Sequence, residues 1–140
     1  MLGNAYSMGS EVMSGDEAVV AHVLVVDDEK AIRKLLAQIL EKRGLAVITC
    51  ADGATAVSSY AENHHSIGLV FLDLVMPDMN GLDVMRAFKE IHPSPRVILC
   101  SGYMPDLEGK TVAQHGFLGF LPKPFGVEAV LDVLDRHVEV

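Results

Sequence analysis

Short apolar runs alternate with amphipathic stretches along most of the chain. The runs at 23–26, 46–50, 70–73, 96–101 and 117–121 are typical of strands buried on both faces of a sheet. Apolar residues at helical spacing predict helices over 30–42, 54–61, 82–91, 107–115 and 127–138, and Gly109 weakens the fourth. Five strands alternating with five helices indicate an α/β fold, a parallel sheet with helices on both faces.

The first part of the chain lacks this pattern. Residues 1–21 hold Gly3, Gly9 and Gly15, several small polar residues and no clear periodicity, so we predict a flexible leader or linker there. The whole chain has 140 residues, half of them apolar, which suits one domain with one core. We therefore assign residues 22–140 to a single domain.

Composition narrows the classes of partner. The net charge of −8 argues against nucleic acid as a direct partner, because phosphate binding needs a basic face. The two cysteines, Cys50 and Cys100, both lie in strand-like runs, which predicts buried, reduced thiols and a cytoplasmic location. No run approaches the roughly 18 apolar residues of a membrane helix, so no membrane insertion is expected.

Polar side chains follow four of the predicted strands. Asp27 and Asp28 end the first strand, Asp73 ends the third, Ser101 ends the fourth, and Lys123 follows the fifth. In open parallel sheets the ligand site lies beyond the carboxyl ends of the strands. The pattern therefore predicts one rim that carries three carboxylates, a hydroxyl and an ammonium group.

This set of groups suits phosphoryl chemistry. Clustered carboxylates attract a hard cation such as Mg²⁺, and a carboxylate beside Mg²⁺ can accept a phosphoryl group as an acyl phosphate. Lys123 and Ser101 would supply the donors that the added negative charge needs. Taken one at a time, each residue also has a purely structural interpretation: Asp73 as a turn cap, Ser101 as a strand-end hydroxyl bonded to the backbone, and Lys123 as a surface lysine. Their joint occurrence at successive strand ends favours a functional site.

The same segments resemble the receiver domain of two-component response regulators. The resemblance rests on VVDDE at 25–29, LDLVMPDMNG at 72–81, SG at 101–102 and KPF at 123–125, and it spans residues 22–138. It implies a flavodoxin-like, doubly wound five-stranded parallel sheet of order 2-1-3-4-5 with five helices. It also implies a signalling phosphoacceptor that catalyses only its own phosphorylation and dephosphorylation.

The resemblance implies a role for each site residue. Asp73 would be phosphorylated by a partner's phosphohistidine. Asp28 and Asp73 would bind Mg²⁺ directly together with the carbonyl of Val75, and Asp27 would assist through water. Lys123 would pair with the phosphoryl group or, before transfer, with Asp73.

The resemblance also implies a switch and partners. Ser101 would move to the phosphoryl oxygen, and Phe120 would turn inward after it. The surface formed by the fourth helix, the fifth strand and the fifth helix would carry the signal, and weak homodimers would form there if the domain is not a monomer. The phosphodonor would be a sensor histidine kinase or a phosphotransfer domain. A cis peptide is expected at Lys123–Pro124, and the loop at 101–103 resembles the receivers of hybrid histidine kinases.

Two pairs of residues need separate interpretation. Val75 is apolar and Tyr103 is bulky at positions where many receivers carry polar groups. We therefore predict that these two residues limit attack by water on the phosphoryl group and lengthen its lifetime. Equally, Tyr103 would simply cover the loop. His64 and His65 lie in a polar run at a helix end, and we interpret them as a solvated end and not as a metal site or a phosphotransfer histidine.

Two other functions fit part of the pattern. A phosphohydrolase of the haloacid dehalogenase type also uses an aspartyl nucleophile, but it carries a second aspartate where this chain has Val75, and no cap insertion is visible. A pseudo-receiver would bind partners without carrying phosphate, which the complete set of acidic, hydroxyl and ammonium groups argues against.

Overall fold

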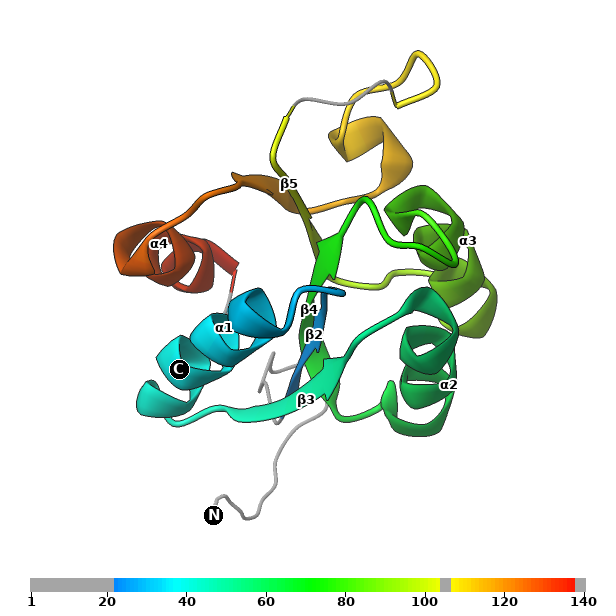
Figure 1. The fold of residues 1–140 in the computed structure, drawn as a ribbon. Coiled ribbons are helices and arrows are strands. Elements are labelled where there is room, and N and C mark those ends of the chain that lie inside the picture. Colours follow the sequence, from blue (N-terminus) through cyan, green and yellow to red (C-terminus); the bar gives the residue numbers. More distant parts are fainter. Residues whose placement is uncertain (1–21, 104–106, 138–140) are drawn as a thin grey trace.

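The computed structural model describes residues 22–103 and 107–137. Labels follow Figure 1. The described elements are β2 (His22–Val26), α1 (Lys30–Lys42), β3 (Ala46–Cys50), α2 (Gly53–Asn63), β4 (Ile67–Asp73), α3 (Gly81–Ile91), β5 (Val97–Ser101), the 3₁₀ turn η1 (Ala113–His115), β6 (Gly119–Pro122) and α4 (Val127–His137).

The strands form one parallel sheet of five strands in the order β3-β2-β4-β5-β6. In chain order this is 2-1-3-4-5, as predicted. Figure 1 shows α1 and α4 on one face of the sheet and α2 and α3 on the other. The arrangement is doubly wound, and because all its strands are parallel, their carboxyl ends lie along one edge.

Two apolar layers explain why the strands have continuous apolar runs. In β2, Val23 and Val25 pack against the α1 and α4 side, while Leu24 and Val26 pack against the α2 and α3 side. β4 repeats the alternation: Phe71 packs in the α1 and α4 layer, and the residues before and after it pack in the α2 and α3 layer. Since both faces are covered, neither face of these strands needs polar residues.

The helix predicted over 107–115 is wrong, and the described residues contain four α-helices where five were expected. Glu108 and Gly109 have φ angles of 60° and 77°, which an α-helix cannot accommodate. Thr111 and Gln114 then form a reciprocal pair in which each side chain accepts the other's backbone N–H, at 3.0 and 2.8 Å. A new turn therefore starts at Thr111, and the left-handed Gly116 ends it after one turn.

Cys50 and Cys100 are buried and free, as predicted. No helix among the described residues is long and apolar enough to cross a membrane. The predicted leader at 1–21, and the end of the last helix at Val138, lie outside the described residues.

Candidate functional site

The polar residues predicted at the strand ends meet at one edge of the sheet. Asp27 follows β2, Asp73 ends β4, Ser101 ends β5 and Lys123 follows β6. Asp27, Asp73 and Ser101 are 2%, 5% and 2% exposed, and no other polar or charged residue in the described part of the chain is buried. Because buried polar groups are costly, their concentration at one edge marks a functional site.

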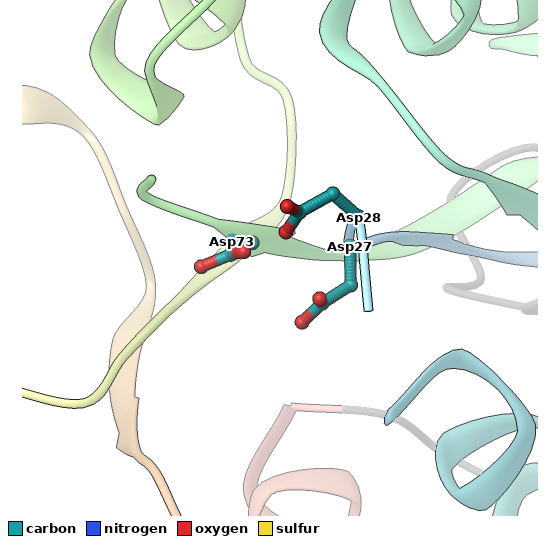
Figure 2. A group of neighbouring side chains, drawn as sticks. All are labelled: Asp27, Asp28 and Asp73. Atoms are coloured by element: carbon teal, nitrogen blue, oxygen red, sulfur yellow. The ribbon is translucent and has the colours of Figure 1, made fainter. Parts of the chain in front are cut away.

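Three carboxylates form the acidic part of this site. Asp27, Asp28 and Asp73 each offer an oxygen, and these oxygens lie within 4.8 Å of one another. Figure 2 shows the neighbours Asp27 and Asp28 pointing to different sides beside Asp73. Asp28 is exposed while the other two are buried. An oxygen-only donor set with one solvent-facing member fits a hydrated Mg²⁺ ion.

Lys123 partly neutralises these carboxylates. Its ammonium lies 2.7 Å from Asp27 and 3.4 Å from both Asp73 and Glu29. Burial alone would lower the pKa of Lys123, but the hydrogen bond and charge of Asp27, with Asp73 and Glu29, raise it. One ammonium among four carboxylates leaves excess negative charge, which a cation would balance.

The ionised form of Asp73 is destabilised at this edge of the sheet. Burial and, after it, the charge of Asp27 raise the pKa of Asp73, and Lys123 opposes both, with a net result of about 6. The backbone N–H of Val75 reaches Oδ1 of Asp73 only at 3.4 Å. The negative charge of Asp73 is therefore not fully compensated by its neighbours. A bound cation would stabilise this charge.

An open pocket of about 400 Å³ gives access to Asp73. Val75 and Tyr103 stand on its margin with 53% and 61% of their surface exposed. The Ser101 hydroxyl accepts a 3.3 Å hydrogen bond from the backbone of Tyr103, so its own loop holds it in this structure. The pocket is lined by Asp28, Glu29, Asp73, Val75, Ser101, Gly102, Tyr103 and Lys123.

Backbone contacts fix the strand ends relative to one another. The Lys123 N–H donates to the carbonyl of Ser101 at 2.8 Å, and the Lys123–Pro124 peptide is cis, as expected. Phe120 lies opposite Leu99 in the register of β5 and β6 and packs, half-buried, against the α2 and α3 layer. Its side chain therefore packs β6 against the core on that face of the sheet.

Sequence reasoning missed two supporting residues. Asp78 accepts hydrogen bonds from the backbone N–H groups of Gly53 and Ala54, at 3.0 and 2.9 Å, and so caps α2 from a different loop. Gly81 packs so tightly that an added Cβ would lie 3.0 Å from the Asp73 carbonyl oxygen. The motif at 72–81 contains both residues, but no local pattern shows which backbone groups they approach.

Comparisons with known proteins agree with this site. Residues 23–135 match the response regulator receiver domain. The chain is 35% identical to chemotaxis protein CheY of Bacillus subtilis, over 84% of the chain and 98% of that protein. It is 33% identical to sensor kinase CckA of Brucella abortus, over 85% of the chain but only 13% of that protein.

A solved structure shows the same fold. The CheX-CheY-BeF3-Mg complex from Borrelia burgdorferi is 32% identical, with a TM-score of 0.78 over 91% of this chain and 96% of that one. The likeness therefore extends over most of this chain.

Proposed function

The chain belongs to the response regulator receiver domain family, and from that membership we propose that Asp73 is the residue that accepts the phosphoryl group. Receiver domains are signalling phosphoacceptors and not conventional enzymes, and this chain has the acidic pocket for that activity. The observation that carries the choice of Asp73 is its position. It is buried at a strand end and lines an open pocket.

The transfer is a displacement at phosphorus. An oxygen of the Asp73 carboxylate bonds to phosphorus while the phosphorus–nitrogen bond of the donor phosphohistidine breaks, and the electron pair stays on the imidazole. The donor is a sensor histidine kinase or a phosphotransfer domain. Lys123, 3.4 Å from Asp73, turns from its carboxylate partners to the phosphoryl oxygens as charge builds there.

The donor set fits Mg²⁺. Asp28 and Asp73 would hold the ion directly with the carbonyl of Val75, and Asp27, which already pairs with Lys123, would assist through water. When bound, the ion neutralises negative charge on the carboxylates and on the incoming phosphoryl group. The excess of carboxylates over ammonium groups at this edge supports the assignment.

The signal then leaves through Ser101 and Phe120. Phosphorylation adds roughly −1.5 to −2 charge at the edge, which draws the Ser101 hydroxyl away from its 3.3 Å contact with Tyr103. Phe120 is half-buried and fills the space that this movement opens. The output surface is formed by η1, β6 and α4, which correspond to the fourth helix, fifth strand and fifth helix of the predicted order. A weak homodimer would form through the same surface. A shift in the populations of two arrangements of this surface is sufficient to transmit the signal to a partner.

The wider assignment follows from the same proposal. Residues 22–140 form the receiver domain and residues 1–21 a leader, and the domain works in the cytoplasm without direct contact with nucleic acid or membrane. Relatives include a CheY matched over 98% of its length and a sensor kinase of which the chain spans 13%. The chain could therefore act as a single-domain regulator, like the first relative, or as the receiver of a hybrid kinase, like part of the second.

Intact mass after incubation with Mg²⁺ and a small acyl phosphate tests the proposal. We expect one added phosphoryl group on the wild type and none on Asp73→Asn, with the adduct abolished when Mg²⁺ is chelated. Asp83→Asn, an exposed carboxylate on α3, is the matched control and keeps the adduct. No adduct despite bound Mg²⁺ would indicate a pseudo-receiver, and fast donor turnover without an adduct would indicate a phosphatase.

A further inference from the structure

Three histidines gather at the end of the sheet that is opposite to Asp73. His64 is the C-cap of α2, His65 follows it, and His92 is the C-cap of α3. β4 begins at Ile67 and reaches Asp73 after seven residues, so the two ends are about 20 Å apart at roughly 3.3 Å per residue. The histidines are therefore a separate feature from the acidic pocket.

The ring of His64 is in contact with the rings of both other histidines. Its centroid is 4.0 Å from that of His65 and 5.8 Å from that of His92, with Tyr60 at 5.9 Å on the inner side. The interpretation of 64–65 as a solvated helix end holds for exposed His65, but His64 is half-buried. Sequence spacing did not reveal His92, which comes from another helix.

One nitrogen in this cluster lacks a partner. Nδ1 of His64 is buried and makes no hydrogen bond in the described structure. A buried ring nitrogen without a partner costs free energy that a bound cation or donor would recover. The exposed His65 and His92 make no side-chain hydrogen bond or ion pair with the residues that the structure describes, so no such contact holds their rings in their present orientation.

The surroundings favour positive charge. The C-terminal ends of helices carry partial negative charge, and the histidines sit at two such ends. α2 and α3 are held together by the stacked rings of Tyr60 and Phe88, 4.2 Å apart, so the distance between the two ends is fixed by packing. A cation here would be held by both helices.

We propose that His64, His65 and His92 form a binding site for a late first-row divalent cation such as Zn²⁺ or Ni²⁺. Neutral imidazole nitrogens are preferred ligands of these ions, whereas Mg²⁺ selects oxygen. His64 supplies the inner nitrogen, and the two exposed rings turn to complete three ligands, which leaves water in the remaining positions. The ion joins the C-terminal ends of α2 and α3 and does not take part in phosphoryl transfer.

Zn²⁺ titration calorimetry with excess Mg²⁺ present tests this site, because Mg²⁺ occupies the acidic pocket. We expect one equivalent of Zn²⁺ to bind the wild type. His64→Ala and His92→Ala should each weaken binding about tenfold or more. Zn²⁺ should also raise the Tm of the wild type and not that of the His64→Ala/His92→Ala double variant.

Two controls keep the result specific. His115→Gln changes a histidine outside the cluster, retains a donor for the Leu107 carbonyl and should bind Zn²⁺ as the wild type does. Asp28→Asn should also leave Zn²⁺ affinity unchanged. His92 is exposed, so its replacement leaves the core intact, which the urea midpoint verifies. Absence of Zn²⁺ binding, equal affinity in the double variant, or loss of binding in Asp28→Asn would overturn the proposal.

Discussion

The ammonium of Lys123 lies 2.7 Å from the carboxylate of Asp27, closer than to any other acidic group among the described residues. Both side chains are mostly buried, with 14% and 3% of their surface exposed. The sequence led us to expect Asp73 as the partner of Lys123 before transfer, and Asp73 is the more distant of the two at 3.4 Å. Asp27 therefore holds Lys123 in place beside Asp73, the proposed phosphoacceptor.

Removing this ammonium should destabilise the protein. Lys123→Ala leaves two buried carboxylates facing each other, and we expect the free energy of unfolding at neutral pH to fall by about 2 to 3 kcal/mol without Mg²⁺. Lys110→Ala replaces an exposed lysine and should change it by less than about 0.5 kcal/mol. Urea unfolding measures both variants, and equal effects would show that the Asp27 pair contributes little.

The stability of the metal-free protein should depend on Asp73 ionisation. Its folded pKa of about 6 exceeds the reference value of 3.8, so the native state binds more protons and stability falls as pH rises through this window. Asp73→Asn removes the penalty and should gain up to about 3 kcal/mol near neutral pH. Urea unfolding in EDTA should show the gain vanish near pH 4 or below, and a gain independent of pH would contradict this origin.

A side chain at Gly81 should destabilise the protein. A Cβ there would lie 3.0 Å from the Asp73 carbonyl oxygen and 3.0 Å from Cα of Leu74, and both are backbone atoms that cannot rotate away. Gly81→Ala should lose about 1 to 3 kcal/mol of stability and slow phosphorylation by an acyl phosphate. At Gly119 the closest contact of an added Cβ is an ordinary 3.6 Å, so Gly119→Ala is the control. Matching rates and stabilities for the two variants would refute the steric argument.

Asp78 should stabilise α2 in a pH-dependent way. The hydrogen bonds from Gly53 and then Ala54 lower the pKa of Asp78, so its stabilising effect is present above the ordinary value of 3.8 and is lost as pH falls through the folded pKa. Asp78→Ala should lower the urea midpoint at neutral pH and match the wild type in strong acid. The control is Asp132→Ala, an exposed position on α4 that should not lower the midpoint.

The residues on the pocket margin should control the phosphoryl lifetime. Val75 and Tyr103 are exposed there, and neither carries a carboxylate or amide group that would orient an attacking water. The double variant Val75→Asn/Tyr103→Glu should lose its phosphoryl group about tenfold faster or more. The decay of the added mass measures this rate, and an unchanged rate would show that Tyr103 only covers the loop.

The sequence by itself determined the elements and the chemistry of the site. Apolar periodicity depends on local geometry, so the five strands and the helices α1 to α4 were predicted close to their observed bounds. The parallel arrangement then brought Asp27, Asp73, Ser101 and Lys123 to one edge, because the carboxyl ends of parallel strands share an edge.

Only the tertiary structure decided which of these groups touch. In the sheet β4 lies between β2 and β6, yet the side chain of Lys123 lies nearer to Asp27 than to Asp73. The left-handed backbone at Glu108 and Gly109 removed a helix that periodicity favoured. The packing of α2 on α3 placed His92 beside His64, 28 positions earlier in the chain. Such contacts join residues far apart in sequence, and their distances follow from the packing of whole elements and not from a local pattern.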